Sequence, residues 1–153
     1  MIHHLHRRQE IVADMETVWR FFSTPANLNA LTPPDLKFRI VGSLPEKMYQ
    51  GQIIEYRIQF VPRVWTTWLT EIRHVEENRY FVDEQRVGPY KLWYHEHTFY
   101  ENNGRVTIED HVTYIVGFGP SGDVVNALWI NKTLNQVFDY RAQKVAEIFG
   151  AKR

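Results

Sequence analysis

Two histidines two positions apart, His95 and His97, stand in a segment that is otherwise rich in aromatic residues. Asp110 lies in the next alternating segment, beyond an Asn-Gly pair typical of a tight β-hairpin. If Asn102-Asn103 forms the two-residue turn, His95 faces Asp110 directly across the hairpin. Because a carboxylate orients a histidine ring and raises its basicity, this pair has the residue types needed to move protons in a cyclisation or dehydration.

Two other interpretations of these residues stay open. The pair can be a satisfied polar bridge in the core or at a pocket wall, and we favour this because perturbed pairs are often structural. His95, His97 and Asp110 also suit zinc or iron. No further ligand is evident in the sequence, so we expect no metal and no cofactor.

Alternation along the hairpin assigns its side chains to two faces. In the pairing above, Phe99 faces Val106 and Trp93 faces Val112, on the same face as His95. The opposite face carries mainly polar residues, as expected of a surface in contact with solvent. We therefore place the following residues towards the core: Trp93, His95, His97, Phe99, Ile108, Asp110, Val112 and Tyr114.

A charged side chain interrupts the apolar stripe of the last predicted helix. Leu134, Phe138, Arg141, Val145 and Ile148 recur at helical spacing. A guanidinium on this face needs a buried carboxylate, a ligand's carbonyl or carboxylate, or access to the rim. We favour the structural role, because the charge needs a partner whether or not a ligand is present.

Further candidates come from the strands in the middle of the chain. Segment 52–60 alternates, with Ile54, Tyr56, Ile58 and Phe60 on one face. The face occupied by Asp83 and Gln85 depends on the length of the following turn, so it is undetermined, and Gln85 is kept as a candidate. The residues predicted to bind a ligand are Tyr56, Ile58, Phe60, Gln85, Trp93, His95, His97, Phe99, Ile108, Asp110, Val112, Tyr114, Leu134, Phe138 and Arg141.

Periodicity and turn signals predict the elements that position these residues. A strand at 2–12 precedes two short helices, at 15–22 and 25–30, and a long helix capped by Ser121 or Asp123 runs to about Phe149. Short turns between the remaining strands predict an antiparallel sheet. These six strands are 36–41, 52–60, 64–76, 79–87, 90–100 and 105–116. The prediction is an α+β fold in which a curved sheet of about seven strands packs on the long helix.

Composition limits the class of protein. The 153 residues suffice for one domain, 1–153, and 18 basic residues balance 18 acidic ones, which disfavours nucleic-acid binding. Without cysteine, neither a disulfide nor a thiol nucleophile is available. Neither a signal peptide nor an apolar run long enough to span a membrane is evident, so the expected location is the cytoplasm.

The chain resembles the START-like SRPBCC superfamily, which includes polyketide cyclase/dehydratase-like, coenzyme-Q-binding and birch-pollen-allergen proteins. The likeness is in particular to small bacterial ligand-binding members, some called cell-division inhibitors. It implies the helix-grip fold and a hydrophobic pocket, and a functional link to an epimerase-like protein, since some relatives are fused to such a domain. The segments that carry the likeness are Asn27–Ile40, Phe81–Tyr90, Trp93–Phe99, Asp110–Tyr114, Phe118–Pro120 and Phe138–Arg141.

Three functions are consistent with these residues and with the resemblance. The leading one is non-catalytic binding of a hydrophobic small molecule, such as a lipid, isoprenoid, polyketide or aromatic metabolite, between sheet and helix. The first alternative is a cyclase/dehydratase-type enzyme that uses His95 with Asp110 as acid and base. The second is an interaction or stress-response domain whose cavity is filled by its own side chains.

Overall fold

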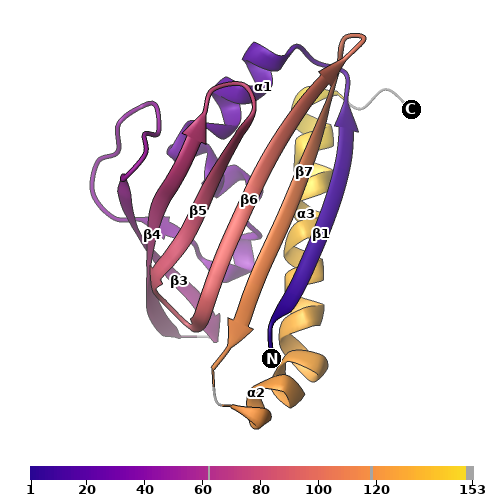
Figure 1. The fold of residues 1–153 in the computed structure, drawn as a ribbon. Helices are drawn as coiled ribbons and strands as arrows, with labels where there is room; N and C mark the ends of the chain where they lie inside the picture. The colour runs from indigo at the N-terminus through magenta and orange to yellow at the C-terminus, as the bar shows by residue number, and fades with distance from the viewer. Residues whose placement is uncertain (62, 118, 151–153) are drawn as a thin grey trace.

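The computed structural model describes residues 1–61, 63–117 and 119–150. Its main feature is one seven-stranded antiparallel sheet with strand order β1-β7-β6-β5-β4-β3-β2 (Figure 1). The strands are β1 (His3–Ile11), β2 (Arg39–Ile40), β3 (Ile53–Val61), β4 (Val64–Glu76), β5 (Tyr80–Val87), β6 (Tyr90–Asn102) and β7 (Arg105–Val116).

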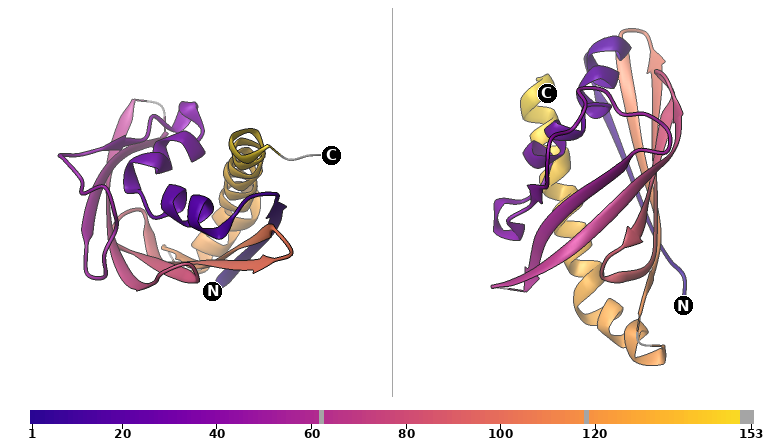
Figure 2. Two further views of the ribbon diagram at one scale, coloured as in Figure 1. Left: turned by 90° about the horizontal axis from the view of Figure 1, so that it is seen from above. Right: turned by 90° about the vertical axis from the view of Figure 1, so that its left-hand side faces the viewer.

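The helices cover one face of this sheet. Seen from above, the sheet curves around a hollow, and the short helices and the long C-terminal helix lie on its open side (Figure 2). The predicted helix-grip architecture is therefore confirmed. None of the helices in the described residues is long and apolar enough to cross a lipid bilayer. The helical segments are α1 (Met15–Phe22), η1 (Pro25–Leu31), η2 (Pro34–Leu36), α2 (Pro120–Val125), η3 (Asn126–Ile130) and α3 (Asn131–Phe149).

Two predicted boundaries were wrong. The predicted strand 36–41 shortens to β2, because η2 ends at Leu36 and Lys37 adopts a left-handed conformation with φ 45°. The last helical run begins at Pro120, and Asp123 lies inside it. Asp123 does not cap that run; its Oδ1 accepts from the N-terminal ammonium at 3.0 Å.

The β6–β7 hairpin has a different register from the one predicted. Its turn is Asn103-Gly104, with φ of 52° and 73°, because a type I′ turn needs positive φ at both central residues and Asn-Gly tolerates this best. The shift pairs Asp110 with His97 and Val112 with His95. Moving the turn by one residue moves each partner by two, so the predicted faces are unchanged.

A polar layer separates two apolar clusters between sheet and helix. Along β6, Trp93 belongs to one cluster and Phe99 to the other, and His95 and His97 lie between them. The same order is repeated on α3, where Arg141 stands between Phe138 and Val145, and on β7, where Asp110 stands between Val112 and Ile108. All the residues assigned to the inner face of the hairpin are buried, as predicted.

The connection from β7 into α2 depends on a close backbone approach at Gly122. A Cβ atom there would lie 2.0 Å from the Gly117 carbonyl oxygen. We expect Gly122→Ala to lower the free energy of unfolding by about 1–3 kcal/mol, because backbone must move to relieve the clash. Gly117→Ala is the matched control, since a Cβ there meets nothing within 4 Å. Equal urea-unfolding midpoints for the two variants would contradict this view of the connection.

Candidate functional site

One carboxylate oxygen, Oδ1 of Asp110, is surrounded by three nitrogen atoms. His95 Nε2 lies 2.9 Å away, His97 Nδ1 3.1 Å away, and a terminal guanidinium nitrogen of Arg141 3.1 Å away. All four residues are buried. Because an ionised carboxylate only accepts hydrogen bonds, His95 Nε2 donates to Asp110, and the Arg141 guanidinium forms an ion pair with it.

Opposing effects act on the pKa of Asp110. Burial alone would raise it, but the Arg141 charge and the contacts with both histidines together hold the pKa well below its usual range. Arg141 also forms a hydrogen bond of 3.2 Å with His97 Nδ1, which accepts because a guanidinium only donates. The carboxylate therefore stays ionised and joins β7 both to β6 and to the long helix.

Arg141 has the buried carboxylate partner that its position in the apolar stripe requires. Its guanidinium carbon also lies 5.3 Å from the centre of the Phe22 ring and 6.0 Å from that of Phe138. These aromatic rings exclude water from the ion pair between Arg141 and Asp110. The ion pair holds the long helix against the sheet.

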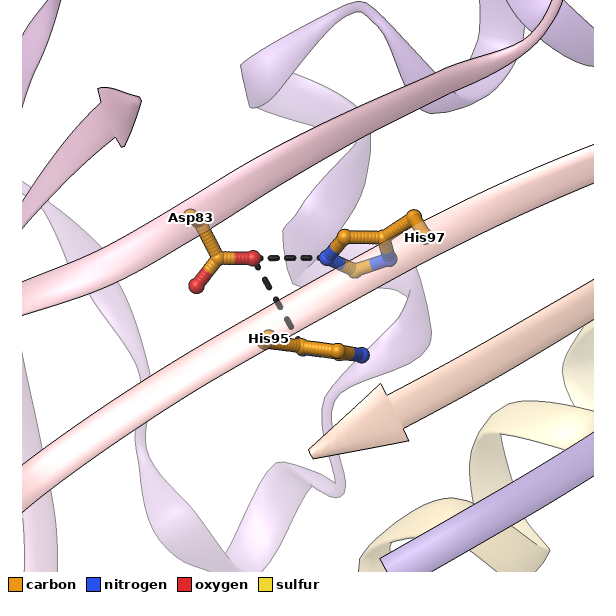
Figure 3. A group of neighbouring side chains, drawn as sticks. All are labelled: Asp83, His95 and His97. Atoms are coloured by element: carbon orange, nitrogen blue, oxygen red, sulfur yellow. Dashed lines mark hydrogen bonds and ion pairs between the residues drawn. The ribbon is translucent and has the colours of Figure 1, made fainter. Parts of the chain in front are cut away.

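A second carboxylate, Asp83 on β5, contacts the other sides of both histidine rings. Its Oδ2 lies 2.6 Å from His97 Nε2 and 3.6 Å from His95 Nδ1 (Figure 3). Asp83 pairs with His95 across the β5–β6 ladder, and this places it on the inner face, which the sequence left undetermined. The two rings lie with their centres 3.6 Å apart, and Phe81 stacks on His97 at 4.0 Å.

The surroundings keep Asp83 ionised and His95 neutral. Burial alone would raise the pKa of Asp83, but the His97 hydrogen bond and the positive groups nearby lower it. Burial, together with the neighbouring His97, lowers the pKa of His95 to about 4, against the opposing effect of Asp110. His95 is therefore a neutral ring near pH 7, with its proton on Nε2 and an unprotonated Nδ1 on the side of Asp83.

A cavity of about 180 Å³ lies between the sheet, η1 and α3. Its wall is mainly aromatic and aliphatic, and its polar end is formed by Asp83, His95, His97 and Arg141. Tyr56 also lines it; burial, with a smaller contribution from the Asp83 charge, raises the pKa of the Tyr56 phenol above its usual range. The phenol therefore keeps its proton and can donate a hydrogen bond.

About half of the predicted binding residues line this cavity. Those that do are Tyr56, Ile58, Trp93, His95, His97, Leu134, Phe138 and Arg141. The predicted residues placed elsewhere, in the core around it or at a turn, are Gln85, Phe99, Ile108, Asp110, Val112 and Tyr114. The side chain of Phe60 lies outside the described residues.

Gln85 closes a turn instead of facing the cavity. Its side-chain amide donates to the Tyr90 carbonyl at 2.7 Å, and its Oε1 accepts from the Tyr90 amide at 3.3 Å. These bonds hold the Gly88-Pro89 turn together. Asp110 is also set back from the cavity and acts on it through the histidines and Arg141.

Several cavity-lining residues were not predicted from the sequence. The face on which Asp83 lies depends on the register of β5 and β6. The sequence did not predict this register, because the turn between the two strands is irregular. Trp68 could have been found by continuing the alternation of β4 through Thr70 and Ile72. Phe21 and Leu28 come from short helices, whose orientation is set by tertiary packing and has no clear signal in the sequence.

The overall fold is similar to that of several solved proteins. The Zhui aromatase/cyclase from Streptomyces sp. R1128 matches with a TM-score of 0.67 and 12% identity, over 99% of this chain and 98% of that one. Norcoclaurine synthase from Thalictrum flavum, in complex with dopamine and hydroxybenzaldehyde, matches with a TM-score of 0.65 and 17% identity, over 100% and 90%. A protein from Chromobacterium violaceum matches with a TM-score of 0.71 and 11% identity, over 97% and 98%.

These likenesses define the class of fold: the chain has the helix-grip fold of START-like SRPBCC proteins. No protein-family model matches the sequence, and no curated protein sequence matches it significantly.

The ion pair between Asp110 and Arg141 should be important for stability. We expect Asp110→Asn to lower the free energy of unfolding by about 3–5 kcal/mol, because it removes the carboxylate that Arg141 contacts in the interior. Glu10→Gln serves as the control, since it removes an ion pair with Arg105 in which both side chains are about half exposed. Urea unfolding in which Asp110→Asn loses as little stability as Glu10→Gln would contradict the importance of this ion pair.

The neutral state of His95 predicts a loss of stability in acid. The unfolded chain takes up a proton at this ring near its ordinary pKa of about 6.5, whereas the folded protein does so only near 4. Stability should therefore fall as the pH falls from about 6.5 to about 4. In His95→Gln this part of the decline should disappear, as measured by urea midpoints at pH 7 and pH 5. A variant with the same decline as the wild type would show that His95 is not responsible.

Proposed function

We propose that this chain is a single ligand-binding domain that holds a small aromatic molecule with one polar group between the sheet and α3. The observation that carries the proposal is the 180 Å³ cavity with an apolar wall and one polar end. An apolar cavity of about 150 Å³ is enough to bind benzene. Of the ligand classes expected from sequence, aromatic metabolites fit this space best.

The polar end supports a ligand that can both donate and accept hydrogen bonds. Asp83 offers a carboxylate to a hydroxyl or amine, while Arg141 and Tyr56 offer donors to an oxygen atom. Within the described part of the chain, the Tyr56 hydroxyl has no hydrogen-bond partner. A phenol or an aromatic aldehyde matches this set. The similar fold of norcoclaurine synthase, which binds dopamine and hydroxybenzaldehyde, supports the same class.

The acid–base alternative has a specific observation in its favour. A carboxylate and two histidines face the cavity together, which is the equipment that proton transfer to a bound carbonyl compound requires. The carboxylate that a substrate can reach is Asp83, whereas Asp110 would orient the rings from behind. A cyclase/dehydratase-type reaction would therefore depend on Asp83 with His95 or His97.

The third expectation, a domain filled by its own side chains, has less support. A filled interior would leave no space of this size beside four polar side chains. A cytoplasmic location and a link to an epimerase-like protein stay predictions.

The binding proposal can be tested with hydroxybenzaldehyde as the probe. Leu134→Phe narrows the cavity, so we expect it to weaken binding at least about tenfold in isothermal titration calorimetry. Leu128→Phe makes the same change at a side chain that is 77% exposed, and should leave the affinity within about twofold.

Two results would count against a ligand in this cavity. One is equal affinity in the Leu134→Phe and Leu128→Phe proteins, which would place the probe elsewhere. The other is the absence of binding for hydroxybenzaldehyde, phenol and indole at millimolar concentration, combined with native mass spectra that show no co-purified ligand.

A further inference from the structure

Three side chains at the polar end of the cavity form a set of metal ligands. Asp83, His95 and His97 each present one ligand atom, and these atoms lie within 4.8 Å of one another (Figure 3). We propose that they bind a divalent transition-metal ion such as Zn²⁺. No metal was expected from the sequence, because no ligand beyond His95, His97 and Asp110 was evident; Asp83 is such a further ligand. Imidazole nitrogen with one carboxylate suits zinc and iron(II).

The distances already approach those of a bound metal. Metal–ligand bonds of about 2.1 Å in tetrahedral geometry place neighbouring ligand atoms about 3.4 Å apart. The Asp83 Oδ2 atom is 3.6 Å from His95 Nδ1 and 2.6 Å from His97 Nε2. Tetrahedral coordination would need the second pair to separate by less than about 1 Å, and all three ligand atoms lie within 4.8 Å of one another.

Asp110 holds the rings in the orientation that such a site requires. Metal-binding histidines almost always donate their other ring N–H to a carboxylate or carbonyl. Here His95 Nε2 and His97 Nδ1 lie 2.9 Å and 3.1 Å from Asp110 Oδ1, so both rings turn their opposite nitrogens towards Asp83. Two imidazole–carboxylate pairs therefore converge on one point.

The charges of the buried groups also favour a cation. Asp83 and Asp110 contribute two negative charges to the cluster, and Arg141 contributes one positive charge. His97 Nε2 lies 2.6 Å from Asp83 Oδ2, with a hydrogen-bonding proton between the two atoms. A metal ion can take this place, and a proton is the competing occupant.

The remaining coordination positions would point into the cavity. All three ligands line it, so water or the polar atom of a bound molecule can complete the coordination shell. This proposal is independent of the proposed function, because the metal alone can be tested. Failure to bind metal would leave the binding of aromatic molecules unaffected.

The test is zinc titration of metal-free protein by calorimetry, with Zn²⁺ alone as the probe. We expect one ion per chain with micromolar or tighter affinity. Asp83→Asn should weaken binding more than about 100-fold, since loss of an outer partner alone typically costs 10- to 100-fold. The control is the triple variant His4→Asn, His6→Asn, His111→Asn, which removes histidines gathered on the outer surface and should bind as the wild type does.

A second measurement uses the wild-type protein, so it does not require any variant to fold correctly. Co²⁺ added to the wild type should give the visible absorption of a low-coordinate site, and an anomalous diffraction peak among Asp83, His95 and His97. Zinc binding that is lost in the surface triple variant but kept in Asp83→Asn would overturn the proposal. So would the absence of binding at 100 μM Zn²⁺ (about 10⁻⁴ M, weak for any protein zinc site), which would show that a proton occupies the position.

Discussion

The arrangement of this protein depends on one buried carboxylate oxygen that contacts three nitrogens on two elements. Asp110 Oδ1 joins the central strand pair to the long helix through Arg141 and orients both histidine rings. A buried ion pair is not by itself a strong source of stability, but breaking one leaves an uncompensated charge in the interior. The helix can thus slide along the sheet only by separating Arg141 from Asp110, which fixes one alignment of the two layers.

The polar layer also explains where the cavity lies. Apolar side chains close the space between sheet and helix on either side of it, in two separate clusters. Where the layer crosses the hollow of the sheet, the short side chain of Asp83 and the flat imidazole rings leave space that larger apolar residues would fill. The same residues that align the helix therefore form the polar end of the cavity, which links the stability of the fold to the chemistry of the site.

Much of the fold could be predicted because alternation and turn residues are strong local signals. The strand bounds from β3 to β7 agree with the structure within about two residues. The inner face of the hairpin was also predicted, since a shift of the turn to Asn103-Gly104 moves partners by two and keeps the face. The residue that pairs with His95 was not predicted correctly. The choice between Asn102-Asn103 and Asn103-Gly104 as the turn depends on which two residues adopt a positive φ.

The site was harder to predict, because its parts come from elements that meet only in the folded state. Arg141 stood out as a charge within an apolar stripe, and a buried carboxylate was one of the partners expected for it. Asp83 did not stand out, because its face depends on an irregular turn that Gln85 holds through hydrogen bonds to Tyr90. Without Asp83, the histidines look like one dyad; with it, they lie between two carboxylates, and both acid–base chemistry and metal binding become possible.

The role of Asp110 in orienting the two histidines can be read directly from their ring nitrogens. Long-range ¹H–¹⁵N NMR spectra of the ¹⁵N-labelled protein distinguish protonated from unprotonated ring nitrogens. We expect a proton on Nε2 of His95, which donates to Asp110, and on Nε2 of His97, which donates to Asp83, each in slow exchange with solvent. A His95 ring protonated on Nδ1, or rings that average between tautomers, would contradict this role of Asp110.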